Sequence, residues 1–335
     1  MRIALAAAVI ALSTAGSCTG GAETGAGQES PASRSVRSAV PSGATASSIR
    51  PTPTPPRPTG SATPAPAPRF DSAAAVATVR QLAGTIGPRE ATSARYRAAA
   101  DWLAVRLRAA GYDVRRQPVR VPAGVSWGVP VPAGQTWNVV ATTPGVVAGA
   151  PYLLVGAHLD TVPQAPGAED NASGIAVLLE VARAFAPSGG ARPRLPLVLV
   201  AFGAEEPRGA GDARHHYGSR AYVASLPAAA RTALRGMVSL DRVGVGSVVP
   251  VCTARSADRR LQAELVAAAA RAGAGTRRCA NRSSDHWSFA RTGLSGVRLG
   301  STPYAEYHSA RDLPPVVSRA QLDRTGRLLL AWIRA

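Results

Sequence analysis

The chain has 335 residues and a formal net charge of +18, and all 38 of its basic residues are arginine. Such a charge could indicate a nucleic-acid partner. The arginines are scattered along the sequence, however, and no stacking aromatic residues interleave with them. We therefore expect no nucleic-acid partner, and the length allows one or two folded domains.

The first residues look like a secretion signal. Arg2 precedes an apolar run over 3–12, which is too short to cross a bilayer but suits the hydrophobic region of a signal peptide. Cys18 follows a loose match to the small-residue box of bacterial lipoproteins, in which Ala15 replaces a larger aliphatic residue. The sequence predicts a signal peptide over 1–18 and a protein that is secreted, or anchored outside the cell membrane by a lipid on the cysteine. Ordinary cleavage nearby is the alternative.

The next segment, 19–69, consists almost entirely of serine, threonine, proline, alanine and glycine. Such a composition cannot bury enough surface to offset the entropy lost on ordering, and its prolines favour an extended chain. We interpret it as a disordered tether that precedes a folded domain over 70–335.

Cysteine parity suggests one disulfide. If Cys18 is lipidated or removed, Cys252 and Cys279 remain as a possible pair in an oxidising compartment. Two buried free thiols are the alternative.

From Phe70 onward, helical and strand patterns alternate. Helices are predicted over 71–83, 93–110, 172–185, 217–224, 256–272, 284–291 and 316–333. Strands are predicted over 112–121, 136–142, 152–157, 195–202, 236–241, 247–252 and 296–300. Short apolar strands between helices indicate a sheet covered on both faces, so we expect a single α/β domain with three α/β/α layers and a mostly parallel mixed sheet.

Five short motifs carry side chains suited to metal chemistry. They are GAHLD at 156–160, GAEDNASG at 167–174, FGAEE at 202–206, SLD at 239–241 and YHSARD at 307–312. Ligand sites in open α/β sheets lie at the carboxyl ends of the strands, where His158, the glutamate pair 205–206 and Asp241 are all expected. The motifs therefore predict one site, and a two-zinc hydrolase is the leading interpretation.

The individual motifs support zinc for different reasons. Zinc takes imidazole nitrogen and carboxylate oxygen, and a catalytic site leaves one position open for water. Asp160 follows His158 by two residues, so its carboxylate could hold the other ring nitrogen. Glu205 and Glu206 would repel each other at a strand end unless a cation binds one of them, and their side chains should point in different directions.

Asp170 has an ordinary structural alternative. It lies in a glycine-bounded turn before a helix, where an aspartate is commonly an N-cap. Asn171 or Ser173 could serve that purpose as well, which would leave Asp170 available for metal.

These motifs resemble those of the two-zinc aminopeptidases related to bacterial leucyl aminopeptidases, a group that includes glutaminyl cyclases and glutamate carboxypeptidases. The resemblance spans roughly 70–335 and extends to IGPR at 86–89, GSRAYV at 218–223 and SDH at 284–286. It implies two zinc ions per chain and a set of roles for the motif residues. His158 and Asp241 would hold one zinc, Glu206 and His308 the other, Asp170 would bridge them, Glu205 would be the general base, and Asp160 and Asp285 would support the site without binding metal.

The chain departs from that family pattern over 207–217, where an insertion carries His215 and His216. Extra metal ligation by these histidines is possible in principle, but exposed loop histidines are commoner, and His286 is more typical of a structural residue. The resemblance implies an aminopeptidase that removes N-terminal residues from peptides or proteins, and we expect a monomer. Another metallo-exopeptidase, a single-zinc glutaminyl cyclase and a noncatalytic binding ectodomain are the alternatives, and the complete set of ligands and base favours an enzyme.

Overall fold

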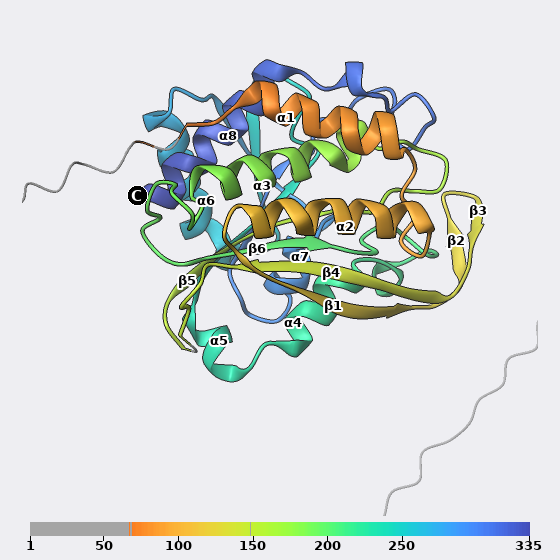
Figure 1. Cartoon of the computed structure of the whole chain (residues 1–335), viewed down its shortest axis with the longest axis horizontal. Helices are drawn as coiled ribbons and strands as arrows, with labels where there is room; N and C mark the ends of the chain where they lie inside the picture. The colour runs from red at the N-terminus through yellow and green to blue at the C-terminus, as the bar shows by residue number, and fades with distance from the viewer. Residues whose placement is uncertain (1–66, 68, 148) are drawn as a thin grey trace, which may run out of the picture. The chain divides into compact units, whose positions relative to one another are not determined.

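The computed structural model describes residue 67 and residues 69–147 and 149–335 (Figure 1). The predicted signal peptide and nearly all of the predicted tether lie outside these residues. No helix of the described part is long and apolar enough to cross a membrane.

A mixed sheet of eight strands forms the centre of the fold, in the order β1-β4-β6-β5-β7-β10-β8-β9. The strands and a separate two-stranded hairpin, β2–β3, have these bounds: β1 Asp113–Val121, β2 Gly124–Ser126, β3 Val129–Val131, β4 Gly134–Thr142, β5 Tyr152–His158, β6 Leu197–Phe202, β7 Leu234–Asp241, β8 Val249–Thr253, β9 Thr276–Ala280 and β10 Gly296–Gly300. The four central strands β6, β5, β7 and β10 are mutually parallel, and β1, β4 and β8 pair antiparallel with their neighbours towards the centre.

Helices cover both faces of the sheet. Their bounds are α1 Ser72–Val79, continued by a π-helical stretch Arg80–Ile86, α2 Ala94–Ala109, α3 Ser173–Ala184, α4 Tyr217–Ser225, α5 Ala228–Ala233, α6 Arg259–Arg271, α7 His286–Ala290 and α8 Arg319–Arg334. Figure 1 shows α1, α2, α3 and α8 on one side of the sheet and α4 and α5 on the other. The predicted fold class, a three-layer α/β/α domain with a mostly parallel mixed sheet, is confirmed.

Strand alternation produces the two apolar layers. In β5, Leu153 and Val155 pack into the core beneath α1, α2, α3, α6 and α8, whereas Leu154 points to the opposite face. There it joins Tyr222 of α4 and Phe289 of α7. Because successive side chains of a strand face opposite sides, an unbroken apolar strand requires cover on both faces.

The predicted elements are present with small differences at their ends. The strand expected over 195–202 begins at Leu197, after Pro196, which has no N–H to donate to a neighbouring strand. The helix expected over 316–333 begins at Arg319, because the Ser318 hydroxyl accepts a bond from the Gln321 N–H and caps it. Four short elements, β2, β3, β9 and α5, were not predicted because none has a sustained apolar period.

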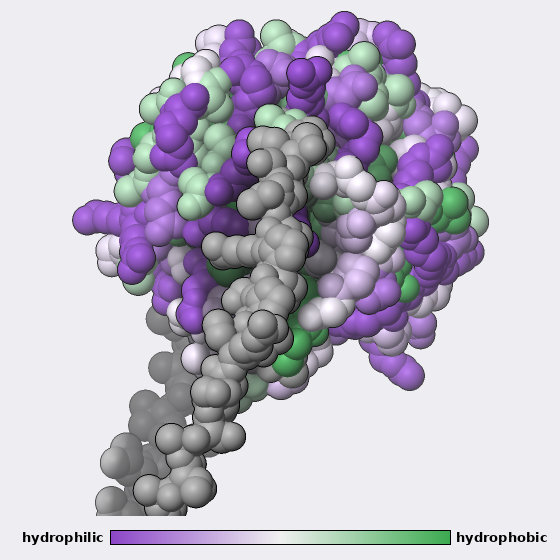
Figure 2. All heavy atoms as spheres, turned by 60° about the vertical axis from the view of Figure 1, so that its left-hand side comes forward, coloured by the Kyte–Doolittle hydropathy of each residue, from purple (hydrophilic) through white to green (hydrophobic). Residues whose placement is uncertain are grey.

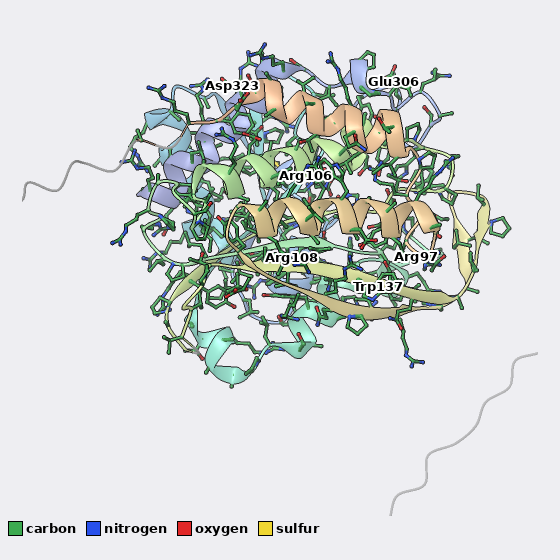
Figure 3. The ribbon with its side chains drawn as sticks, viewed as in Figure 1. Arg97, Arg106, Arg108, Trp137, Glu306 and Asp323 are labelled. Carbon is green, nitrogen blue, oxygen red and sulfur yellow. A yellow bond between two sulfur atoms is a disulfide. The ribbon has the colours of Figure 1, made fainter. Side chains whose placement is uncertain are left out.

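The exposed side of α2 carries several arginines. Arg97, Arg106 and Arg108 project from α2 (Figure 3), and Arg106 lies 3.8 Å from the ring centre of Trp102. On the face drawn in Figure 2, hydrophilic residues are spread over the visible surface and hydrophobic ones lie between them in small groups.

Cys252 and Cys279 form a disulfide between β8 and β9, where they are paired in register. The bond closes a loop with a sequence separation of 27 residues. We expect the double substitution Cys252→Ala and Cys279→Ala to lower the free energy of unfolding by about 3–4 kcal/mol, since the open chain gains loop entropy when unfolded. Denaturant unfolding with and without reductant checks this, and a wild-type chain whose stability does not change with reductant would contradict the assignment.

The Arg89 side chain forms hydrogen bonds to several backbone segments near the carboxyl edge of the sheet. Its fully buried guanidinium donates to five carbonyl oxygens, those of Leu82, Gly87, Leu159, Pro166 and Gly167. Arg89→Met would leave these buried acceptors unpaired, so we expect a loss of about 3–5 kcal/mol of folding free energy. Denaturant titration measures it, and exposed Arg80→Met, a matched control in the same segment, should stay within about 0.5 kcal/mol of the unsubstituted protein.

Candidate metal centre

The motif residues meet at the carboxyl edge of the central strands. His158 is the last residue of β5, Asp241 is the last residue of β7, and Glu205 and Glu206 follow β6. Since β6, β5 and β7 are adjacent and parallel, their ends lie side by side. His308 reaches the same place from the loop that follows β10.

The side chains form two groups that share one aspartate. The first group is His158, Asp170 and Asp241, and the second is Asp170, Glu206 and His308; in each, the potential ligand atoms lie within 4.8 Å of one another. Asp170 presents Oδ1 to His158 Nε2 at 3.1 Å and Oδ2 to His308 Nε2 at 3.1 Å. All five side chains are buried. The structure thus brings together the five sequence-predicted ligands, with the predicted bridging residue between the two pairs.

Neighbouring backbone and side chains fix Asp170 in this position. The Asp312 carboxylate accepts bonds from the Glu169 N–H at 2.9 Å and the Asp170 N–H at 3.1 Å. The first turn of α3 donates instead to Asn171, whose Oδ1 accepts the Gly174 N–H at 3.0 Å. The capping role that aspartate could have taken thus falls to Asn171, and the Asp170 carboxylate faces the two histidines.

The carboxylates of the centre favour the positively charged, protonated form of the neighbouring imidazoles. Although burial opposes it, the negative charge of Glu206 and the contacts with both carboxylates raise the pKa of His308 to about 10. Burial raises the pKa of Glu206 to about 8 despite His308, because Asp170 and Glu205 add further negative charge. Although burial alone would raise the pKa of Asp170, bonds from the two histidines hold it well below its usual value. Bound divalent cations would supply this positive charge and displace the histidine protons.

The donor set fits zinc. Zn–N and Zn–O bonds of about 2.0–2.2 Å in a tetrahedron place ligand atoms roughly 3.3–3.6 Å apart. The separations from His158 Nε2 are 3.1 Å to Asp170 and 3.9 Å to Asp241, and His308 Nε2 lies 3.3 Å from Glu206 Oε1. Each group offers one imidazole and two carboxylates, which leaves a fourth position for water.

Asp241 is further held by two arginines. The guanidinium of fully buried Arg298 lies 2.9 Å from Asp241 Oδ1, and Arg242 lies 3.6 Å from the same oxygen. Although burial opposes it, the charge of Arg298 lowers the pKa of Asp241 below its usual range. Neither arginine was predicted to support the site, nor was Asp312 within the YHSARD motif, because nothing in the local sequence distinguishes a buried partner from a surface charge.

Asp160 supports the site, although through different atoms than expected. Its carbonyl oxygen lies 3.1 Å from His158 Nδ1, whereas its carboxylate is 3.7 Å away. The carboxylate accepts bonds from the N–H groups of Glu205 at 3.1 Å and Glu206 at 3.0 Å. The expected carboxylate–imidazole bond is therefore wrong, because the carboxylate pairs with the two N–H groups that follow β6. Asp160 thereby fixes the backbone of both glutamates.

Glu205 lies beside the ligands and is held from the other side. Its carboxylate comes within 4.8 Å of the ligand atoms of His158 and Glu206. His216 Nε2 lies 3.1 Å from Glu205 Oε1, and His216 is buried, so the expectation of an exposed loop histidine is wrong for this residue. Asp285 is also fully buried, and burial together with the charge of Glu205 raises its pKa to about 7.

Neither of the remaining two histidines belongs to a potential metal-ligand group among the described residues. His215 is half-buried beside His216. His286 is buried and its Nε2 lies 3.0 Å from the Asn281 carbonyl oxygen. Burial and the charge of Arg298 lower the pKa of His286 to about 3, which is consistent with a neutral structural residue.

Backbone strain is concentrated around this centre. Six non-glycine residues in the described part of the chain have positive φ, and they are Trp127, Ala204, His216, Arg242, Ser301 and His308. Ala204 and Arg242 directly adjoin site residues, and His308 is itself a candidate ligand. Residues other than glycine rarely adopt a positive φ, and such backbone strain clusters at functional sites.

Comparison with known proteins agrees with this geometry. The family described as Peptidase family M28 matches residues 138–333, more than half of the chain. The chain belongs to peptidase family M28. This confirms the family resemblance seen in the motifs and identifies the domain as a metallopeptidase-type hydrolase with a zinc centre.

Relatives with known sequences match only part of their own length. Leupeptin-inactivating enzyme 1 of Streptomyces exfoliatus is 32% identical over 160 residues, which cover 47% of this chain and 32% of that protein. An uncharacterized Escherichia coli protein, YfbL, is 30% identical over 182 residues, which cover 52% of this chain and 50% of its own. The chain thus spans between 29% and 50% of the length of the curated relatives it matches.

Solved structures match more completely. BSAP, a zinc aminopeptidase from Bacillus subtilis, superimposes with a TM-score of 0.69 at 19% identity, covering 79% of this chain and 95% of that one. A glutaminyl cyclase from Porphyromonas gingivalis has a TM-score of 0.67 at 23% identity, covering 79% and 98%. At these identities the likeness establishes the fold, and it is shared by hydrolases and cyclases.

Proposed function

We propose that this M28 chain is an exported aminopeptidase that removes N-terminal residues from peptides with two zinc ions per chain. The observation that carries the proposal is the shared aspartate. Asp170 faces His158 with one oxygen and His308 with the other, so that two adjacent ligand groups have a common carboxylate. With both positions of the site occupied, two Zn²⁺ would contribute a charge of +4 and the three ligand carboxylates −3. One hydroxide would balance the remaining charge of +1.

The chain's own residues account for the proton transfers of amide hydrolysis. Zinc, when bound, lowers the pKa of water and polarises the scissile carbonyl. Glu205 accepts a proton from the attacking water, and then donates that proton to the departing amine nitrogen as the C–N bond breaks. His216 holds one oxygen of this carboxylate and Asp160 holds its backbone N–H, so the glutamate is oriented before substrate arrives.

Glutaminyl cyclisation is the second candidate. The observation that favours it is the close fold likeness to glutaminyl cyclases, which is nearly equal to that for the aminopeptidase. The two complete ligand groups favour hydrolysis, because the resemblance implies a single zinc for the cyclases.

The deciding experiment measures bound metal per full-length chain together with two activities. We expect two zinc ions and chelator-sensitive release of amine from aminoacyl-anilides. One zinc with ring closure of an N-terminal glutamine peptide would support the cyclase. No metal and neither activity would leave a noncatalytic binding protein.

Export and lipid attachment are part of the proposal and rest on the sequence of 1–18. In a bacterial host, we expect the full chain to incorporate labelled fatty acid and to fractionate with membranes. Cys18→Ser should abolish both. An unlabelled wild-type chain in the medium would instead support ordinary cleavage and secretion.

A further inference from the structure

The inserted segment 207–217, here called the arm, ends in contact with Glu205. The His216 N–H donates to the Glu205 carbonyl oxygen at 3.0 Å, and His216 Nε2 lies 3.1 Å from Glu205 Oε1. The next residue of the chain, Tyr217, donates its N–H to the Ala204 carbonyl oxygen at 2.8 Å. The end of the arm therefore contacts both the backbone and the carboxylate of the residue that we assign as general base.

The backbone at His216 adds an independent observation. His216 is the N-cap residue of α4, with a φ of 59°, but its side chain caps none of the N–H groups of that helix. Residues other than glycine rarely adopt this left-handed conformation, and serine, threonine, asparagine and aspartate are the usual caps. His216 is also buried. Helix capping does not account for a buried histidine in this conformation, whereas its contact with Glu205 does.

A second contact fixes the arm at a point away from Glu205. Asp212 lies in the short 3-10 turn Asp212–Arg214 near the middle of the arm. Its carboxylate accepts the indole N–H of Trp287 on α7, at 3.1 Å to Oδ1 and 3.0 Å to Oδ2, and Arg291 Nη1 lies 3.3 Å from Oδ2. A hydrogen bond to a carboxylate is roughly twice as strong as one between neutral groups. This contact anchors the arm on α7.

The start of the arm is fixed separately. Buried Arg208 pairs with Glu90 and donates to two carbonyl oxygens of the segments that flank the β2–β3 hairpin, at 3.1 and 2.9 Å. The Arg208 N–H also donates to the Arg214 carbonyl oxygen at 2.9 Å, which makes the arm compact. Because the arm is closed in this way, the position of Asp212 constrains that of His216.

We propose that the contact of Asp212 with Trp287 positions the general base of the proposed peptidase. The contact holds the arm on α7, the arm places the His216 ring, and the ring keeps the Glu205 carboxylate in the orientation that proton transfer requires. This inference rests on the proposed function and adds Asp212, Trp287 and His216 to it as positioning residues. A displacement of about 1 Å caused far from the chemistry can lower a rate about 10²-fold, so a surface contact is sufficient for such an effect.

An effect through α7 alone predicts a different result. Asp285 directly precedes α7 and is fully buried near Glu205, so loss of the anchor would in that case act by moving Asp285. The loss of activity would then be the same whether or not residue 216 carries an imidazole. A double-mutant cycle between Asp212 and His216 distinguishes the two routes, because only coupled residues give non-additive losses.

The first measurements use the zinc-loaded full chain and an aminoacyl-anilide. We expect His216→Ala to lower kcat about 10–100-fold and Asp212→Ala about 3–30-fold, with KM changed less than about twofold and zinc content unchanged. His216→Gln should retain most of the activity, because its amide N–H can reach the same carboxylate oxygen. Alanine and glutamine meet the same backbone strain at this position, so the difference between them reports the contact with Glu205.

The cycle is the deciding measurement. In the His216→Ala background, Asp212→Ala should cause no further loss greater than about twofold. Trp287→Phe should resemble Asp212→Ala, since phenylalanine has no N–H to donate, whereas Asp212→Asn should retain most of the activity, since its amide oxygen can still accept the indole N–H. Additive losses, an unchanged kcat in Asp212→Ala, or loss of zinc in that variant would each overturn the proposal.

A control and a second readout separate failure of this inference from failure of the proposed function. Asp323→Ala removes a partly exposed carboxylate that pairs with Arg327 on α8, and should leave kcat unchanged. Hydrogen exchange of the backbone amides of 205, 206 and 216 needs no substrate, and we expect it to be at least about threefold faster in Asp212→Ala than in the wild-type chain. If the wild-type chain hydrolyses no peptide, the proposed function fails. The exchange then decides the inference, which holds only if it is faster in Asp212→Ala.

Discussion

Glu205→Gln is expected to lower kcat by about 10²–10⁴-fold while the protein keeps its full zinc content. Glutamine has nearly the same shape and still offers an oxygen to His216, 3.1 Å from the present carboxylate, but it cannot accept the proton of water. No candidate ligand is altered, and the backbone N–H groups of residues 205 and 206 can still donate to the Asp160 carboxylate. Turnover measured beside metal content therefore isolates the base from the metal centre.

Glu264→Gln on α6 is the matched control for this substitution. Glu264 pairs with Arg260 on the surface and should leave both turnover and zinc unchanged. Full activity in zinc-loaded Glu205→Gln would remove Glu205 from the mechanism. A variant that lost zinc in proportion to its activity would instead make this glutamate a ligand.

Most of the fold could be predicted from sequence because its strands are long, apolar and bounded by turn residues. β5, β6 and β7 are buried on both faces, so their composition alone distinguishes them from loops. The edge strand β9, Thr-Arg-Arg-Cys-Ala, has no such signal, and its pairing with β8 depends on tertiary contacts and on the disulfide. The β2–β3 hairpin also lacks a sustained apolar period, and its turn, Trp127-Gly128, begins with a residue that is unusual for positive φ.

In the candidate site, too, some residues could be predicted from the sequence and others could not. Its five ligand types and the base occur in motifs at strand ends, so position in the sheet brings them together. Their supporting contacts join residues that no local motif connects: Arg298 to Asp241, Asp312 to the N–H of Asp170, and His216, from the loop after β6, to Glu205. Asp160 shows why such contacts escape local reasoning, since a spacing of two residues allows either its carboxylate or its carbonyl to face His158.

Asp170→Ala is expected to remove both zinc ions, whereas His308→Ala should remove one. Asp170 is the only residue common to both ligand groups of the described centre, so its loss takes one of three protein ligands from each. Losing a residue that merely supports a ligand already weakens metal binding about 10–100-fold, and loss of a ligand itself should cost at least as much at both positions. Activity should then fall to background.

Metal analysis after dialysis against a defined free-zinc concentration measures the difference between these two variants. Asp101→Ala, a surface aspartate that pairs with Arg116, serves as the control and should retain two zinc ions. If Asp170→Ala and His308→Ala lose the same single ion, Asp170 belongs to one group alone. The expectation of two lost ions rests on the two carboxylate oxygens of Asp170, which face separate histidines at 3.1 Å and so lie where each could join a different ligand group.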